Sequence, residues 1–185
     1  MRLSKPRVPA LEMSEMDDQQ REIVERASFD QPINIHKTLA HHPKLLERWL
    51  VFAAHVLNKS TLPARERELV ILRIGWLCRA EYEWAQHVII GRKAGLTDEE
   101  IDRIQSGPDA EGWSDLDRAL LRATDELKDD AFISDATWNE LKKTYTDQQM
   151  MDLIFAVGNY NLVSMTLNSL GVQLDPNMGL EGFKK

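Results

Sequence analysis

The sequence predicts an all-α protein of about eight helices. Three observations support this prediction. Apolar residues recur at intervals of three and four through most of the 185 residues, which is the spacing of an amphipathic helix. Residues typical of helix ends bracket several of these segments. No segment of useful length alternates between polar and apolar side chains as a half-buried strand would.

The N-terminal part is predicted to contain an arm and two short helices. Residues 1–16 include Pro6 and Pro9 and show little periodicity, so we expect an extended arm. A polar helix is expected over 17–27, because two aspartates stand where a helix N-terminus favours negative charge. A short helix near 34–40 follows a connection that contains a proline.

Three helices are predicted in the middle of the chain. The first begins at Pro43, since proline suits the first helical turn, and it runs to about residue 58. The second covers 64–77, where apolar residues again recur at helical spacing. The third covers 81–94, and Gly95 ends it as a glycine after a helix commonly does.

Capping residues set the helix boundaries in the second half of the chain. A Ser or Thr followed three residues later by an acidic residue or Gln can satisfy free backbone N–H groups at a helix start. Three pairs of this kind stand at expected helix starts: Thr97 with Glu100, Ser114 with Asp117, and Thr146 with Gln149. They predict a short helix after Thr97 and longer helices over 115–128 and 147–169. A further helix is expected over 135–144, and Gly171 ends the last one.

These elements are expected to form one domain over residues 17–171, between the arm of residues 1–16 and a tail of residues 172–185. A chain of 185 residues suits a single core. Its composition, 43% hydrophobic and 29% charged, is an ordinary globular balance that can supply that core.

The charge balance excludes several classes of partner. With a net charge of −7, the chain lacks the clustered Lys and Arg that phosphate binding needs, so we expect no nucleic acid partner. It also has no electrostatic attraction to an anionic membrane. No stretch approaches the roughly 18 apolar residues of a membrane span, and the N-terminus lacks the apolar run of a signal peptide. We therefore expect a cytoplasmic protein without a membrane partner.

Cysteine and histidine usage predicts neither a disulfide nor a metal site. Cys78 is the single cysteine, which excludes an intrachain disulfide and points to a reducing compartment. The five histidines show no His-x-x-x-His spacing, and the adjacent His41 and His42 point apart on a helix. The sequence also lacks a glycine-rich phosphate loop and a nucleophile elbow.

The segment from Glu68 to His87 carries the residues best suited to chemistry. Glu83 and His87 are four residues apart, so they share one helix face and can form a hydrogen bond. A carboxylate beside an imidazole fixes its tautomer and raises its basicity, which suits proton transfer. Such pairs are also common on ordinary helix surfaces, so a purely structural pair is the alternative.

Two motifs in this part of the chain resemble a known family. The sequence Leu62-Pro63 is followed after three residues by Arg67-Glu68, and an apolar helix then leads to Glu81-Tyr82-Glu83-Trp84, His87 and Ala94-Gly95-Leu96-Thr97. This pattern resembles the carboxymuconolactone decarboxylase superfamily, which includes the AhpD-like alkylhydroperoxidases. The resemblance covers about residues 43–125 and implies an AhpD-like orthogonal helical bundle.

In the peroxidase branch, the resemblance implies a Glu, a Cys-x-x-Cys pair and a His. These positions fall on Glu68, Ala80, Glu83 and His87, so both sulfurs are absent. A peroxidase of this kind attacks the peroxide with one thiolate and resolves the product with the second. On a continuous helix Cys78 would face away from His87, and we expect a buried structural cysteine. A helix break near Arg79 would change that geometry.

The decarboxylase branch implies chemistry without a cysteine and without a cofactor. It requires acid–base groups in a closed apolar pocket, and Glu68, Glu83 and His87 can supply them. We predict that His87 moves a proton while Glu68 or Glu83 orients it, with one carboxylate pKa raised toward neutrality by burial. The expected enzyme is a decarboxylase, isomerase or related lyase acting on a small organic acid or lactone. The alternatives are an AhpD-like peroxidase, disfavoured by the missing cysteine pair, and a non-catalytic oligomeric binding protein.

Aromatic residues flank this candidate site. Trp76, Tyr82 and Trp84 are candidates to wall an apolar substrate pocket. Packing between helices is the alternative, since large aromatic side chains commonly fill such contacts.

The last long helix carries a polar stripe of Asn161, Ser164 and Asn168 on an otherwise apolar sequence. This stripe is expected to face either the pocket or a subunit interface. The resemblance implies a homo-oligomer, either a dimer, a trimer or a hexamer, and the helix of 147–169 is the candidate for part of its interface.

Overall fold

The computed structural model describes residues 2–28, 31–176, 178–180 and 182–183. Over these residues the chain forms helices and no strand, so the all-α prediction is confirmed. The elements are a short 3-10 helix η1 (Met13–Glu15), then α1 (Asp18–Ala27), α2 (Asn34–Leu39), α3 (Pro43–Asn58), α4 (Ala64–Leu77), α5 (Glu81–Ala94), α6 (Asp98–Ile104), α7 (Asp115–Asp130), α8 (Asp135–Lys142) and α9 (Asp147–Leu170). No helix in this described part is long and apolar enough to cross a membrane.

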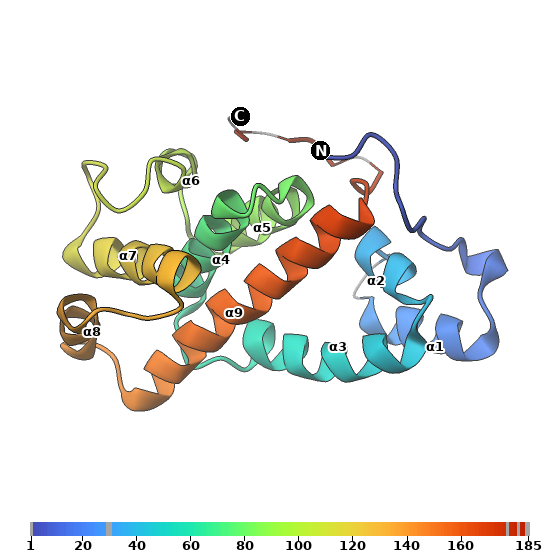
Figure 1. The fold of residues 1–185 in the computed structure, drawn as a ribbon, viewed down its shortest axis with the longest axis horizontal. Helices are drawn as coiled ribbons and strands as arrows, with labels where there is room; N and C mark the ends of the chain where they lie inside the picture. The colour runs from blue at the N-terminus through green and yellow to red at the C-terminus, as the bar shows by residue number, and fades with distance from the viewer. Residues whose placement is uncertain (1, 29–30, 177, 181, 184–185) are drawn as a thin grey trace.

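Helix α4 forms the centre of the fold. It packs against α5, α6, α7 and α9, while α1, α2 and α3 form a separate group on the other side of α9 (Figure 1). Helix α9 runs diagonally across the molecule and contacts α3, α4, α5, α7 and α8. The N-terminal arm lies near the end of α9, where the backbone N–H groups of Arg7 and Val8 donate to the carbonyl of Leu170.

The middle of helix α4, residues 68–75, is buried. Leu69, Leu72 and Ile74 are completely buried, and so is the acidic Glu68. A helix that is apolar on every side is stable only when neighbours cover every side. The charged Arg73 remains within this core because its guanidinium makes two hydrogen bonds, of 2.6 and 2.8 Å, to the Asp125 carboxylate.

The helix ends confirm most of the capping predictions. Thr97 and Thr146 begin α6 and α9 with the reciprocal hydrogen bonds of a capping box. Ser114 accepts from the backbone N–H of Asp117 at the start of α7, without a reciprocal bond. Gly95 and Gly171 end α5 and α9 with φ angles of 102° and 72°, a left-handed conformation that glycine adopts without strain.

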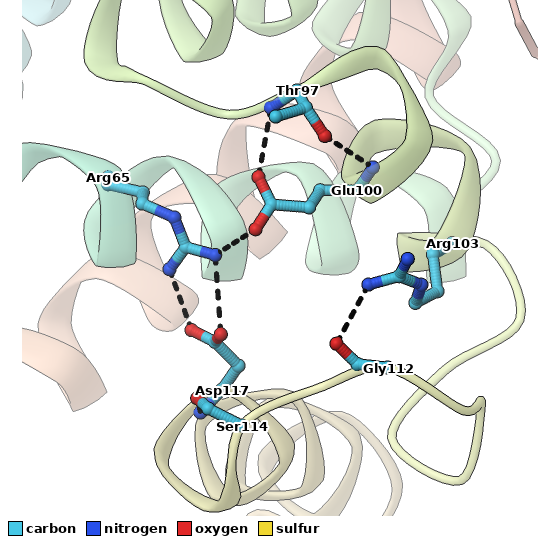
Figure 2. A network of polar contacts seen from close by, with 7 residues as sticks. All are labelled: Arg65, Thr97, Glu100, Arg103, Gly112, Ser114 and Asp117. Atoms are coloured by element: carbon cyan, nitrogen blue, oxygen red, sulfur yellow. Dashed lines mark hydrogen bonds and ion pairs between the residues drawn. The ribbon is translucent and has the colours of Figure 1, made fainter.

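A polar network fixes the start of α4 against α6 and α7. The Arg65 guanidinium donates to the carboxylates of Glu100 and Asp117, and the shortest contact to Asp117 is 2.7 Å (Figure 2). Glu100 also closes the capping box with Thr97, so one residue serves both the helix start and the network. These contacts orient the first turns of α4, from which the next residues run directly into the candidate site.

Candidate functional site

Two glycines allow α4 and α5 to approach closely around the candidate site. A Cβ atom placed on Gly91 of α5 would lie 3.3 Å from Leu72 Cδ1 of α4 and 3.1 Å from Leu96 Cδ1. A Cβ atom on Gly75 of α4 would lie 3.4 Å from the Glu83 Cγ atom. Because neither glycine has a side chain, the two helices lie close enough for Glu68 of α4 to reach the imidazole of His87 on α5.

Glu68, Glu83 and His87 meet in the space between these helices. His87 Nδ1 lies 2.6 Å from Glu68 Oε2 and forms a hydrogen bond with it. His87 Nε2 lies 3.0 Å from Glu83 Oε1 across one helical turn. That contact is close but poorly aligned, and the buried Glu83 Oε1 atom has no hydrogen-bond partner of good geometry. The structure therefore brings all three predicted catalytic residues together.

The site is almost closed to solvent. The exposed fraction is 0% for Glu68, 4% for Glu83 and 5% for His87. Burial alone would lower the pKa of His87, because a low-dielectric interior disfavours the charged imidazolium. The negative charges of Glu68 and Glu83 and their hydrogen bonds outweigh burial and raise that pKa from 6.5 to about 10. His87 is therefore a cation at neutral pH, held between two carboxylates.

Two further side chains complete the surroundings of His87. Arg67 Nε donates to the second carboxylate oxygen of Glu68 over 3.3 Å, so Glu68 is shared between two cationic groups. The Tyr160 ring of α9 packs edge-on against the His87 ring, with centroids 4.7 Å apart and an interplanar angle of 81°. Burial, followed by the charges of Glu83 and Glu68, raises the pKa of Tyr160 well above its usual value of 10. Its hydroxyl therefore keeps its proton.

The candidate substrate-binding aromatics occupy other positions. Trp84 is completely buried and packs against Trp76, with ring centroids 5.8 Å apart. Phe183 of the tail covers both rings, with centroids 4.9 Å from Trp76 and 5.8 Å from Trp84. The Tyr82 hydroxyl donates to Asp175 over 2.6 Å. The aromatic ring in contact with His87 is thus the Tyr160 ring.

The polar stripe of α9 faces the connection between α4 and α5. Asn161 Oδ1 accepts hydrogen bonds from the Cys78 thiol and from Lys128 Nζ, over 3.2 and 3.1 Å. Asn168 Nδ2 donates to the Cys78 carbonyl over 2.9 Å, and Ser164 is completely buried. The stripe therefore serves contacts within the chain.

Cys78 lies at a break between two helices. Arg79, which follows it, has a φ of 51°, and α5 begins only at Glu81. The half-turn separation expected for a continuous helix therefore does not apply. Cys78 is nevertheless buried, as expected, and burial raises the pKa of its thiol against the opposing effects of Lys128 and Ser164. A thiol with a raised pKa is a weak nucleophile at neutral pH.

No group of His, Cys, Asp and Glu side chains in the described part of the chain has the arrangement of a metal site. A small hollow lies near the two ends of the chain, lined in part by Arg2, Tyr82 and Asn168. None of the three candidate catalytic residues lines this hollow.

The sequence alone indicates neither the position of Tyr160 beside His87 nor a role for Arg67. Tyr160 is one aromatic residue in a long apolar helix, and its spacing does not show which neighbour it contacts. Arg67 belongs to the motif that precedes α4, and its position beside Glu68 was the only available signal. The close packing of α4 and α5 at Gly75 and Gly91 could not be predicted either, because helical periodicity does not show how closely two helices approach each other.

The comparisons with known proteins agree with this fold. Residues 43–126 match the sequence model of the carboxymuconolactone decarboxylase family. A search of curated proteins found no significant match.

Solved structures of similar fold cover nearly the whole chain. An uncharacterised peroxidase-related protein with an AhpD core from Ralstonia eutropha JMP134 has a TM-score of 0.81 at 19% identity, covering 97% of each chain. A peroxidase-related protein from Silicibacter sp. TM1040 has a TM-score of 0.78 at 14% identity, covering 99% of this chain and 98% of its own. A cysteine-to-alanine variant of the debrominase Bmp8, in complex with 2,3,4-tribromopyrrole, has a TM-score of 0.77 at 12% identity, covering 94% of each chain.

At these identities the structural similarity establishes the fold alone, and that fold is AhpD-like. The family match covers α3 through most of α7, which includes both helices that carry the candidate site. Residues 43–126 are therefore similar to the carboxymuconolactone decarboxylase family, and the described chain has an AhpD-like helical fold.

Proposed function

We propose that the protein is a cofactor-independent acid–base enzyme, a decarboxylase, isomerase or related lyase acting on a small organic acid or lactone. One observation carries this proposal: a buried imidazole lies 2.6 Å from one carboxylate and 3.0 Å from another. General acid–base catalysis needs a proton donor and acceptor held together in a site that excludes bulk water.

The geometry supports different roles for the two carboxylates. Glu68 hydrogen-bonds His87 on one side and Arg67 on the other, so it orients the imidazole. Glu83 lies at the Nε2 side, and its Oε1 atom has no well-aligned partner. In our proposal Glu83 exchanges a proton with the substrate, while the His87 cation supplies or recovers that proton.

The peroxidase alternative is less well supported. Ala80 and Glu83 stand where the family's peroxidase branch has its cysteine pair, and Cys78 is buried with a raised pKa. The AhpD-like fold also accommodates other chemistry, since the debrominase Bmp8 is described in complex with a small brominated pyrrole. A peroxide-consumption assay with a thiol reductant should show no activity in the wild type or in Cys78→Ser.

The proposed function is tested by a screen of small organic acids and lactones, with substrate loss and product formation followed by NMR. His87→Gln keeps hydrogen-bonding groups in place but cannot carry the proton, so turnover should fall about 100-fold or more. His55→Gln on the exposed side of α3 is the matched control and should retain activity. Undiminished turnover in His87→Gln would contradict the proposal, and ligand binding without any turnover would support a binding protein instead.

We also propose that the protein forms a homo-oligomer through an apolar surface on α3 and α9. Large apolar side chains lie exposed along both helices: Leu45, Val51 and Phe52 on α3, and Met151, Ile154, Phe155, Leu162 and Met165 on α9. Phe52 and Phe155 join the two sets, with ring centroids 5.9 Å apart. A contiguous apolar surface of this kind is typical of a protein interface.

The oligomer is tested by light scattering coupled to size-exclusion chromatography. The wild type should elute as a dimer, trimer or hexamer of the 21.3 kDa chain. Phe155→Lys should shift the population to monomer, because it places a charge in the centre of the apolar surface. A wild-type monomer at micromolar concentration would overturn this assignment.

A further inference from the structure

We infer that Tyr160 and Arg67 form the entrance to the Glu68–His87–Glu83 site and bind the carboxylate of its substrate. This inference rests on the proposed function and adds to it the two groups that recognise the carboxylate of a small organic acid. Neither residue has an assigned role in the acid–base chemistry itself, and each has hydrogen-bonding capacity that the described chain does not use.

The Tyr160 hydroxyl is the first of these unused groups. Tyr160 is 6% exposed, yet its hydroxyl makes no hydrogen bond with any described residue. The hydroxyl is not one of the fully buried polar atoms without a partner, so it retains access to a solvent molecule or a ligand. Since the ring is packed against His87, an oxygen atom of a ligand beside the imidazole can accept this hydrogen bond.

The Arg67 guanidinium is the second. Among the described residues only its Nε atom is engaged, by Glu68, while its two terminal nitrogens make no hydrogen bond within the chain. Its side chain is 12% exposed, compared with 0% for Glu68, so it lies toward solvent from that carboxylate. The planar fork of a guanidinium can bind a carboxylate with two hydrogen bonds.

Both groups contact the same buried cluster. Arg67 Nε lies 3.3 Å from Glu68, Glu68 hydrogen-bonds His87, and the Tyr160 ring packs against the His87 ring. With His87 protonated, the charges of Glu68 and Glu83 are balanced by those of His87 and Arg67. An incoming carboxylate therefore meets a neutral cluster with two outward donors instead of two uncompensated anions.

The same cluster offers an acceptor for the substrate's proton. Glu83 Oε1 is buried, lacks an aligned hydrogen bond and lies 3.0 Å from His87 Nε2. Binding and proton exchange would thus use separate residues of one site.

The test is isothermal titration calorimetry of the full chain with benzoate and succinate, and with benzamide as the uncharged match for benzoate. Wild type should bind at least one of the two acids, and benzamide should bind at least tenfold more weakly than benzoate. Tyr160→Phe keeps the ring against His87 and removes only the hydroxyl, so affinity should fall about fivefold. Arg67→Gln should lower affinity about tenfold or more, because the lost hydrogen bonds carry charge.

Tyr145→Phe is the matched control for Tyr160→Phe. Tyr145 is also buried, and its hydroxyl also lacks a partner, but it lies near Glu66 and Asp117. This variant should bind the acids as wild type does. Arg67→Lys provides a second test of Arg67 if Arg67→Gln does not fold, since it keeps the charge and loses the fork, and its affinity should also fall.

The outcomes separate this inference from the proposed function. Three results would contradict the proposed binding roles of Tyr160 and Arg67. They are binding of neither acid, equal binding of benzamide and benzoate, and unchanged affinity in the Tyr160 and Arg67 variants. If carboxylate binding depends on Arg67 and Tyr160 but turnover is undiminished in His87→Gln, the binding roles are supported and the acid–base role of His87 is rejected. If His87→Gln loses turnover but binding is unchanged in the Arg67 and Tyr160 variants, the acid–base role is supported and the binding roles are rejected.

Discussion

Two buried histidines in this protein have opposite electrostatic surroundings. His36 of α2 is 9% exposed, its Nδ1 atom has no hydrogen-bond partner, and its ring lies edge-on to Trp49 with centroids 6.3 Å apart. Burial lowers the pKa of His36 from 6.5 to about 4. His87 is buried even more deeply, yet two carboxylates raise its pKa to about 10. At neutral pH the first is neutral and the second is charged.

The difference shows that burial alone does not assign a role to a histidine. In both cases removal from water disfavours the imidazolium. Only at His87 do acidic partners reverse that effect, and only there does the imidazole have groups with which it can exchange a proton. His36 behaves as a packed ring of the α2–α3 region, whereas His87 is the centre of a proton-transfer site.

Replacing each histidine by leucine should give the largest contrast between the two regions. His87→Leu leaves Glu68 and Glu83 buried without their shared cation, and it should lower the free energy of unfolding by about 3–5 kcal/mol. His36→Leu removes an imidazole that already lacks a partner at Nδ1, so it should change stability by no more than about 1 kcal/mol. Urea denaturation measures the free energy of unfolding of both variants, and an equal loss in the two would contradict the proposed difference between the histidines.

The pH dependence of stability should have two limbs with different origins. The folded pKa of His36 is lowered, so its contribution is intact above pH 6.5 and is lost as the pH falls toward 4. The folded pKa of His87 is raised, so its contribution is intact below pH 6.5 and is lost as the pH rises toward 10. Each slope should approach about 1.4 kcal/mol per pH unit.

Variants assign these two limbs to their residues. His36→Leu should flatten the acid limb between pH 6.5 and 4 and leave the alkaline limb unchanged. His87→Gln should flatten the alkaline limb only. Chemical denaturation at a series of pH values measures both, and an alkaline limb that persists in His87→Gln would mean that another group causes it.

The smallest expected effect concerns the glycines that bring α4 and α5 together. Gly91→Ala places a methyl group 3.1 Å from Leu96 Cδ1 and 3.3 Å from Leu72 Cδ1, and both leucines are tightly packed. We expect a loss of about 1 kcal/mol in stability, together with a lower pKa of His87 as the helices separate. Gly75→Ala meets Glu83 Cγ only at 3.4 Å, and the gain in helix propensity of up to about 1 kcal/mol should keep it neutral or stabilising. A larger loss from Gly75→Ala than from Gly91→Ala would contradict this account.

Most of the fold could be predicted from the sequence, because its signals are local. Pro43, the capping box at Thr146 and the glycine at Gly171 each mark a helix end through backbone chemistry that depends on few neighbours. The separation of α4 from α5 was also predicted, but the positive φ of Arg79 was not, because a non-glycine residue rarely adopts it.

The candidate site was only partly predictable for the same reason. The spacing of Glu83 and His87 places them on one face of a helix, and the family resemblance added Glu68. Tyr160 lies 73 positions along the chain from His87, and its contact exists only because α9 crosses α5 in the folded structure. The polar stripe of α9 was visible in the sequence, but only the structure shows that Asn161 faces Cys78.

The most direct test of the central claim is an NMR titration of the His87 imidazole with ¹⁵N-labelled protein, assigned by comparison with His87→Gln. The account predicts that both ring nitrogens carry protons at pH 7 and that deprotonation occurs near pH 10. A His87 ring that is neutral at pH 7, titrating at or below 6.5, would contradict it.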